Sequence, residues 1–237
     1  MRFDNYVASV LNISRNKASE LIKGGKVLAN GEICTKVSSE VSEAKISLLD
    51  EIYVGRGALK LKSFLEAMKF DLVSKNALDI GSSTGGFMQI LLERGVKSVT
   101  GVDVGTDQLD ASLRSDERVK IYEKTDIREF AKENLNKFDL ITCDVSFISL
   151  KEILPSIDAL AGENCDIILL FKPQFEVGRT VKRNKKGVVT DAKAVREARA
   201  KFELAAANLG WIMRQTLECE VKGKEGNAEF FYAFNKR

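Results

Sequence analysis

The sequence predicts an α/β protein, a doubly wound and mainly parallel sheet with a small α+β unit before it. From residue 77 onward, apolar strand-like runs alternate with helical patterns, the order that places helices on both faces of a parallel sheet. A turn rich in Gly and Ser, residues 81–86, joins the first of these strands to a helix. The segment before residue 54 has a different pattern, so we expect two domains.

The N-terminal segment is predicted to contain two helices and a small hairpin-rich sheet. A first helical pattern stops near Asn12, and Ser14 is placed to cap a second helix. Gly24-Gly25 ends that helix. Asn30-Gly31 lies between two short strand patterns and is typical of a two-residue hairpin turn.

Basic residues outnumber acids in this segment up to residue 36, whereas acids dominate the residues that follow. The segregation predicts one basic face suited to phosphate contacts, with Arg15 and Lys17 on the second helix at its centre. A solvated helix surface is the alternative interpretation. The candidates for RNA contact in this segment are Arg2, Arg15, Lys17, Lys23 and Lys26.

The rest of the chain is predicted to form a seven-stranded sheet with helices between the strands. A helix at 58–65 leads into it, and a longer helix at 191–209 begins with Asp191 as its N-cap. The last two strand patterns follow one another directly, so they are expected to pair as a hairpin with the final strand antiparallel. The strand candidates are residues 77–80, 98–104, 119–123, 138–145, 166–171, 211–219 and 229–234.

Composition limits the class of protein. With 237 residues and 44% hydrophobic content, the chain can hold one large domain, or a standard domain with an appendage. No run approaches the roughly 18 apolar residues of a membrane span, and the start lacks a signal-peptide pattern. A cytoplasmic location is therefore expected.

Composition also limits the chemistry. The chain contains no histidine, which excludes a histidine general base, a Ser-His-Asp triad and most zinc-enzyme sites. The four cysteines are far apart in the sequence, so neither a metal site nor a disulfide framework is predicted. The net charge of +3 does not by itself require a nucleic-acid partner.

The turn after the first strand of the sheet predicts a nucleoside-bearing cofactor. Ligands of doubly wound sheets bind outside the carboxyl ends of the strands, and Asp103 ends the second strand, where an acid can accept ribose hydroxyls. The glycines at 81, 85 and 86 do not fit the dinucleotide fingerprint, and Asp79 precedes them. A carboxylate there repels phosphate but can hold a cationic amino-acid group or a sulfonium, as in S-adenosylmethionine. The alternative is an ordinary turn whose glycines serve backbone geometry.

Asp126 is predicted to lie at the adenine amino group, although an N-cap for the following helix explains it nearly as well. The cofactor-binding candidates are Asp79, Gly81, Ser82, Ser83, Gly85, Gly86, Phe87, Asp103, Asp126 and Asp144.

Four charged residues are expected to meet at the same edge of the sheet. Asp144 and Lys172 each follow an apolar parallel strand directly. Glu229 begins the last strand, and Lys60 lies on the helix that leads into the sheet. A buried lysine beside a second ammonium is less basic than a free one, so Lys172 is the predicted base or hydroxyl-orienting group, held by the two carboxylates. Taken singly, each residue could equally be a turn cap or a surface charge.

The motifs of the first segment resemble the S4 RNA-binding domain. The ordered matches are Arg2-Phe3-Asp4, Ser14-Arg15-Asn16-Lys17-Ala18, Leu21-Ile22, Gly25-Lys26-Val27 and Asn30-Gly31. The resemblance covers most of residues 1–53 and implies RNA binding.

Five further stretches carry a second resemblance: Gly55–Leu61, Asp79–Phe87, Cys143–Ile148, Phe171–Glu176 and Gly226–Phe231. With the S4-like segment they closely resemble the TlyA or hemolysin A family, ribosomal RNA 2′-O-methyltransferases with an FtsJ-type catalytic domain. The resemblance implies a seven-stranded Rossmann-like methyltransferase sheet. The domain assignment is 1–53 for the S4-like domain, 54–60 for the linker and 61–237 for the methyltransferase domain, with which the helix of Lys60 is expected to pack.

The family resemblance also implies the chemistry. By it, S-adenosylmethionine is the methyl donor and the target is the ribose 2′-hydroxyl of a cytidine in ribosomal RNA. The stretch 50–54 lacks the tryptophan of the family linker, so coupling between the domains is expected to differ. The chain also lacks the extra C-terminal helix of longer members, and the short subtype implies activity on large-subunit RNA only. The residues that correspond to the family's catalytic tetrad are Lys60, Asp144, Lys172 and Glu229.

A second basic run, residues 178–187, follows the strand that ends at Lys172. Such a run is usually a solvated loop, but its place on the substrate edge favours contact with the RNA backbone. The target nucleotide is expected to leave its stack before reaction. The remaining candidates for RNA contact are Arg56, Arg179, Lys182, Arg183, Lys185 and Lys186.

Other functions are consistent with parts of the pattern. A small-molecule O-methyltransferase would use the same cofactor site, and an RNA-binding assembly factor could retain the fold without turnover. The family's hemolysin name raises a pore-forming alternative, but no membrane span or strongly amphipathic terminal segment is visible. The partner we expect is ribosomal RNA or a ribosomal subunit.

Overall fold

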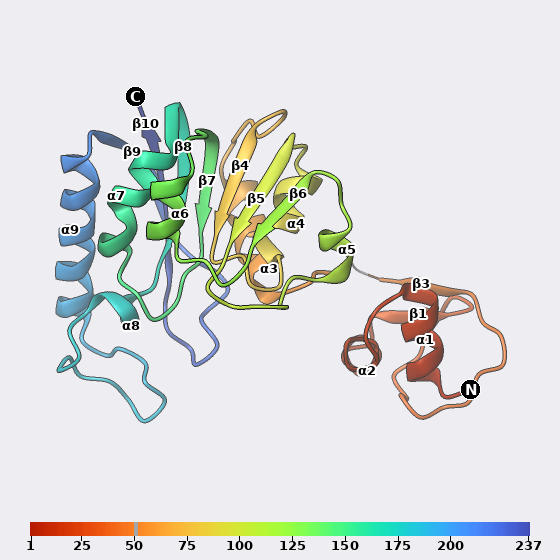
Figure 1. The fold of residues 1–237 in the computed structure, drawn as a ribbon. Coiled ribbons are helices and arrows are strands. Elements are labelled where there is room, and N and C mark those ends of the chain that lie inside the picture. The colour runs from red at the N-terminus through yellow and green to blue at the C-terminus, as the bar shows by residue number, and fades with distance from the viewer. Residues whose placement is uncertain (50–51) are drawn as a thin grey trace. The chain divides into compact units, whose positions relative to one another are not determined.

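The computed structural model describes residues 1–49 and 52–237 and divides the chain into two compact units, Met1–Ile52 and Tyr53–Arg237 (Figure 1). The first two residues of the tryptophan-free stretch 50–54 lie outside the described residues. In the described part, no helix combines the length and the apolar character needed to cross a bilayer.

The N-terminal unit contains two helices and a three-stranded sheet of order β2-β1-β3. The predicted caps are present: the αL conformation of Asn12 ends the first helix, and Ser14 Oγ accepts a hydrogen bond from Lys17 N at the start of the second. The third strand was not predicted. The elements are α1 Phe3–Leu11, α2 Arg15–Lys23, β1 Val27–Ala29, β2 Glu32–Ile33 and β3 Ile46–Leu48.

The second unit contains a seven-stranded sheet of order β6-β5-β4-β7-β8-β10-β9. The pairs from β6 to β8 are parallel, and β10 is antiparallel to both β8 and β9. This confirms the predicted doubly wound sheet with an antiparallel last strand. The strands are β4 Asn76–Ile80, β5 Ser98–Val102, β6 Val119–Tyr122, β7 Phe138–Cys143, β8 Ala161–Phe171, β9 Trp211–Glu218 and β10 Phe230–Lys236.

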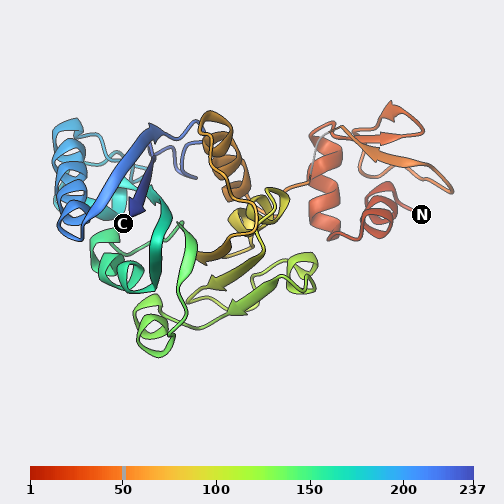
Figure 2. The same cartoon turned by 90° about the horizontal axis from the view of Figure 1, so that it is seen from above.

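Helices cover both faces of this sheet (Figure 2). One apolar cluster joins the sheet to α3 and α4, and a second cluster on the other face joins it to α6, α7 and α9. Strand β8 shows why both faces are buried: Ile167 and Leu169 belong to one cluster, and Ile168 and Leu170 belong to the other. The helices are α3 Arg56–Ala67, α4 Gly86–Glu93, α5 Ala111–Arg114, α6 Ile127–Glu133, α7 Leu150–Leu160, α8 Pro173–Glu176 and α9 Ala192–Asn208.

The stretch assigned to a linker, 54–60, contains the start of the helix that the sequence analysis placed at 58–65. Residues 56–60 form the first turns of α3, because Ala58 and Leu61 are buried in the cluster beneath that helix. A Cβ on Gly86 would lie 2.8 Å from Ala58 N, so α3 and α4 approach closely at a glycine. Helix α3 is therefore part of the second unit, and it places Lys60 in a buried position against the sheet.

Candidate active site

The turn after β4 lies against the loop that follows β7. Gly81 has φ +78°, and a Cβ there would lie 2.8 Å from Asp144 O. Gly85 has φ +93°, and a Cβ there would overlap Leu113. Both positions need a residue without a side chain, which explains why the glycine spacing differs from the dinucleotide fingerprint.

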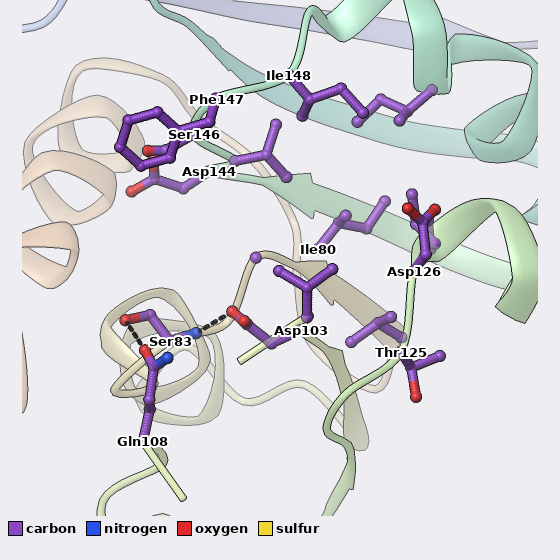
Figure 3. Close-up of a pocket in the computed structure, with 16 residues that line it drawn as sticks. Ile80, Ser83, Asp103, Gln108, Thr125, Asp126, Asp144, Ser146, Phe147 and Ile148 are labelled. Carbon is purple, nitrogen blue, oxygen red and sulfur yellow. Dashed lines mark hydrogen bonds between the residues drawn. The ribbon is translucent and has the colours of Figure 1, made fainter. Parts of the chain in front are cut away.

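A cavity of about 510 Å³ opens at the carboxyl ends of β4, β5 and β7 (Figure 3). Asp103 lies on its wall, where Oδ2 accepts a hydrogen bond from Ser83 N at 2.8 Å and Oδ1 accepts one from Gly105 N at 2.7 Å. Two backbone donors thus fix the orientation of this carboxylate. Its remaining lone pairs are available to a ligand in the cavity.

Asp126 also lines the cavity, and it serves as the N-cap of α6. Its Oδ1 accepts from Arg128 N at 2.8 Å, and Oδ2 forms an ion pair with Arg128 at 2.7 Å. The bond from the Arg128 guanidinium lowers the pKa of the Asp126 carboxyl. The capping alternative is therefore what the structure shows, while the adenine contact stays a prediction.

Asp79 lies beneath the turn, fully buried, and it is not among the residues that line the cavity. Its Oδ1 accepts from Thr142 Oγ1 at 2.7 Å, while Oδ2 has no hydrogen-bond partner among the described residues. Burial raises the pKa of Asp79 to about 7, opposed by the Thr142 bond and assisted by the charges of Asp144 and Asp103. Ser82 Oγ is also buried and likewise has no hydrogen-bond partner among the described residues.

A second hollow, of about 230 Å³, adjoins the first. Both are lined by Gly81, Ser83, Asp144 and Ser146, so they meet at the end of β7. Lys172 lines only the second hollow. The predicted cofactor residues Ser82, Gly86 and Phe87 also lie on its wall.

Two lysine–carboxylate ion pairs occupy this edge. Lys172 Nζ lies 2.6 Å from Asp144 Oδ1 and donates to Ser146 Oγ at 3.0 Å. Lys60 Nζ lies 2.7 Å from Glu229 Oε2. Glu229 thus holds Lys60, whereas the sequence analysis expected it to hold Lys172.

Strand register and helix spacing bring the two pairs together. Phe230 pairs with Phe171, so the next residue on each strand, Glu229 and Lys172, comes at the adjoining position. A Cβ on Gly57 would lie 3.6 Å from Asp144 Oδ2, and Lys60 is three residues further along the same face of α3. Both lysines are less than a tenth exposed.

Known families match both units of the chain. The FtsJ-like methyltransferase model matches residues 53–236, and the S4 domain model matches residues 1–45. A Campylobacter jejuni protein named 23S rRNA (cytidine-2′-O)-methyltransferase TlyA is 51% identical over the whole of both chains. The chain belongs to the TlyA family of FtsJ-like methyltransferases. A Mycobacterium tuberculosis protein named 16S/23S rRNA (cytidine-2′-O)-methyltransferase TlyA is 39% identical, over 92% of this chain and 83% of its own.

Solved structures agree with the TlyA assignment. A Streptococcus thermophilus protein described as a hemolysin is 31% identical, with a TM-score of 0.73, over 100% of this chain and 88% of its own. An S-adenosylmethionine-dependent methyltransferase from Listeria monocytogenes is only 15% identical, with a TM-score of 0.58, over 76% of this chain and 98% of its own. That likeness shows the fold of the methyltransferase unit.

Phe147 is a feature of this TlyA-family site that the sequence analysis missed. It lines the first cavity, is 92% exposed, and has φ +67°, which is rare for a bulky residue (Figure 3). Its ring lies 5.1 Å from that of Phe175. The signal in the sequence was an aromatic residue three positions after Asp144, in a loop that has no core to fill.

Glu176 was also missed. Its carboxylate accepts from Ser149 Oγ at 2.6 Å and from Leu150 N at 2.7 Å. Burial raises the pKa of Glu176. Because Glu176 follows Lys172 and Ser149 follows Asp144, these bonds tie together the two loops that carry the first ion pair.

The predicted RNA-contact residues of the N-terminal unit are only partly free. Asp4 is buried and pairs with Arg2 at 3.1 Å and with Arg15 at 2.8 Å. The hydrogen bonds from these guanidiniums, Arg2 first, hold the pKa of Asp4 well below its usual range. Lys17 lies 3.5 Å from Glu20, and Lys23 is exposed.

In the second basic run, Arg183 differs from the prediction. Its guanidinium is half-buried and donates to the carbonyl oxygens of Gln174, Gly178, Arg179 and Val181. It therefore organises the loop, because its donors are used within the chain. The exposed cations of this run are Arg179, Lys182, Lys185 and Lys186.

Proposed function

We propose that the protein uses S-adenosylmethionine to methylate the 2′-hydroxyl of a cytidine ribose in ribosomal RNA, with large-subunit RNA as its substrate. The observation that carries the proposal is the meeting of a nucleoside-sized cavity with two buried lysine–carboxylate pairs at one edge of the sheet. The full-length C. jejuni relative named for this activity on 23S rRNA supports the choice of substrate.

The residues at the cavity fit the proposed cofactor. Asp103 presents a fixed carboxylate for ribose hydroxyls. Gly81 and Gly85 let the backbone approach closely, and beneath the same turn Asp79 Oδ2 and Ser82 Oγ have no hydrogen-bond partner among the described residues, so polar capacity is left for a cationic amino group. When bound, S-adenosylmethionine supplies a methyl group on a positively charged sulfur.

Lys172 is the residue that we assign to the 2′-hydroxyl. Asp144 and Ser146 fix its ammonium at the wall of the second hollow. Its ammonium orients the hydroxyl oxygen toward the first cavity, and the Asp144 carboxylate is the group of the pair that can accept the hydroxyl proton. Holding two reactants in such a geometry can contribute about 7–11 kcal/mol. The Lys60–Glu229 pair is assigned to the ribose and its neighbouring phosphate.

Phe147 is assigned to the base of the target nucleotide. A base must leave its stack before its ribose can enter a narrow hollow, and an exposed aromatic ring at the mouth of the site offers it a new stacking partner. Such stacking contributes about 1–3 kcal/mol per base. The positive φ of Phe147 directs the ring outward at a cost to the backbone.

The basic residues are assigned to the RNA backbone. In the N-terminal unit, Lys17, Lys23 and Lys26 remain the candidates, together with the exposed portions of Arg2 and Arg15. Asp4 holds the two guanidiniums in fixed directions, which lowers the entropy lost when they bind phosphate. The S4 match over residues 1–45 supports this assignment.

The test is methyl transfer from a labelled donor to undermodified large and small ribosomal subunits, followed by mapping of the labelled nucleotide and sugar atom. We expect label on the 2′-oxygen of a cytidine in large-subunit RNA, and none with Lys172→Ala. RNA binding without label would favour the assembly-factor alternative. Label on small hydroxyl compounds without RNA would favour a small-molecule enzyme.

A further inference from the structure

The connection between β9 and β10, residues 219–229, delivers Glu229 to the site through a closed turn. Gly223 N donates to Asn227 O at 2.9 Å, and Gly226 N donates to Gly223 O at 2.8 Å. A Cβ on Gly223 would lie 2.6 Å from Glu229 Oε1, so the Gly223 backbone rests against that carboxylate. The position of Glu229 therefore depends on the turn 223–227.

A second segment, which we call the basic hairpin, comprises residues 182–190. Thr190 N donates to Lys182 O at 3.1 Å, and Asn184 N donates to Val188 O at 2.9 Å. The tip turns at Gly187, which has φ +78°. The hairpin is thus a preformed element, and it presents Lys185 and Lys186 to solvent.

Asn227 joins the basic hairpin to the β9–β10 connection. Its side chain is 6% exposed, and Oδ1 accepts a hydrogen bond from Val189 N at 3.0 Å. The hairpin and the connection extend from the same edge of the sheet (Figure 1). Asn227 therefore contacts the basic hairpin through its side-chain oxygen. Through its backbone carbonyl it holds Gly223, which rests against Glu229.

The charged side chains of the two joined segments are mostly positive. The hairpin contains no acid, and Glu225 is the acid among residues 222–228. Joined by Asn227, the two segments form one cationic surface next to Glu229, suited to the phosphates that flank the target nucleotide. The exposed lysines of this surface are Lys182, Lys185, Lys186, Lys222 and Lys224.

We propose that Asn227 is a positioning residue that couples RNA contact on the basic hairpin to the placement of Glu229. This inference rests on the proposed ribosomal RNA substrate. Phosphates bound by the hairpin hold Val189 against Asn227, which keeps the turn 223–227 closed. The closed turn fixes Glu229, and Glu229 in turn holds Lys60 at 2.7 Å. Binding of the RNA substrate to the basic hairpin thereby fixes the Lys60–Glu229 pair of the active site.

The test measures kcat and KM for large-subunit RNA together with donor affinity and thermal unfolding. Asn227→Ala should lower kcat about 10-fold, within the usual range for coupling along contiguous contacts, with donor affinity unchanged. Asn227→Asp keeps an oxygen that can accept from Val189 and should restore most of kcat. A residue that only stabilises the fold would shift the unfolding temperature without this split.

A double-mutant cycle tests the coupling between Asn227 and the basic hairpin directly. The pair Lys185→Ala and Lys186→Ala changes two exposed side chains and should raise KM and lower kcat. When the lysine pair is combined with Asn227→Ala, kcat should fall by less than the product of the two separate effects. Both changes interrupt the same connection between RNA on the basic hairpin and Glu229. The matched control is Lys97→Ala with Lys201→Ala, two exposed lysines on other elements, which should change neither constant.

Three results would overturn the inference while the wild type stays active: unchanged kcat in Asn227→Ala, effects that multiply in the cycle, or a lysine pair that changes KM alone. If Asn227→Ala unfolds, the kcat of the lysine pair decides. A wild-type protein that binds the donor and methylates no ribosomal RNA would instead overturn the proposed function.

Discussion

The seven-stranded sheet has a carboxyl edge, where its parallel strands end, and an amino edge, where they begin. Each edge contains a lysine–carboxylate ion pair beside a hollow. At the carboxyl edge, Lys172 pairs with Asp144 beside a cavity of about 510 Å³. At the amino edge, Lys75 pairs with Asp166 beside a hollow of about 530 Å³. Asp166 also accepts from Asn235 Nδ2 at 3.3 Å, so this pair is built into the β8–β10 contact.

Neither an ion pair nor a hollow of this size marks the functional edge. What differs is unmet hydrogen-bonding capacity. Leaving aside Asp144 Oδ1, which pairs with Lys172, the buried side-chain oxygens without a partner in the described structure belong to Asp79, Ser82 and Gln174, all on carboxyl-edge segments. Buried polar atoms are normally paired, so a cluster of unpaired ones points to a ligand.

The sharpest way to break the comparison is to remove one lysine at each edge. Lys172→Ala should lower kcat/KM by about 10²–10⁴-fold, the range for loss of a group that handles the reacting proton. Lys75→Ala should leave kcat/KM nearly unchanged and lower the free energy of unfolding by about 1–3 kcal/mol, because Asp166 loses its cation. Steady-state kinetics and urea unfolding measure the two effects. Equal losses of activity would erase the distinction between the edges.

The second prediction concerns the buried carboxylate of Asp79, whose Oδ2 has no hydrogen-bond partner among the described residues. Its pKa is about 7 in the folded protein and 3.8 for the free group. Between these values the folded state keeps the proton that the unfolded state has lost, so the free energy of unfolding falls as pH rises through this window. Above pH 7 the whole cost, about 4 kcal/mol at 1.36 kcal/mol per pH unit, is present.

Asp79→Asn should remove that slope. The variant should gain stability relative to wild type as pH rises from about 4 to 7, and the difference should level off above pH 7. Urea unfolding followed by fluorescence of Trp211, the single tryptophan and a buried residue of the second unit, measures it. A stability difference that does not vary with pH would show that Asp79 is ionised in the folded protein.

Two apolar side chains with equal exposure sharpen the comparison further. Phe147 at the carboxyl edge and Leu135 near the amino end of β7 are each 92% exposed. Phe147→Ala should lower kcat/KM for RNA by about 5- to 150-fold, corresponding to about 1–3 kcal/mol of lost stacking. Leu135→Ala should have no effect on the same kinetics. An equal response of both variants would mean that Phe147 contributes only general surface contact.

The smallest expected effect concerns single exposed charges. Removal of one phosphate contact reduces the slope of log affinity against log salt by about 1. Arg179→Ala, in the run that follows Lys172, should show this change in RNA-binding titrations across salt concentrations. Lys97→Ala, just before β5, should keep the wild-type slope, and a reduction there would indicate that RNA binding is not confined to one edge.

The strands could be predicted from sequence because their patterns are local. Ile167 to Leu170 read as a buried strand, and their alternation between two apolar clusters follows from the strand period of two. The short strand β3 was missed because its Ile-Ser-Leu alternation covers only three residues, too few to indicate a strand before they pair with β1. Likewise, Lys60 was placed on a helix, but the helix start at Arg56 was set by packing against α4.

The site was predicted residue by residue, but not in its pairing. Strand ends indicated that Asp144, Lys172 and Glu229 would share one edge. Which carboxylate holds which lysine depends on side-chain directions across α3 and β10, and these are not encoded in any short motif. Arg183 shows the same limit, because its carbonyl partners come from a loop shape that the charge pattern does not specify.

The direction of β10 has a consequence for engineering this scaffold. Parallel strands reach the ligand edge with their last residues, so each loop there must lead back through a crossover helix. Strand β10 reaches it with its beginning, after a plain hairpin link from β9. Residues 220–228 could therefore be exchanged between relatives as one segment, altering which nucleic acid is selected, provided that the hydrogen bonds from Arg56 and Ser63 of α3 to this segment are kept.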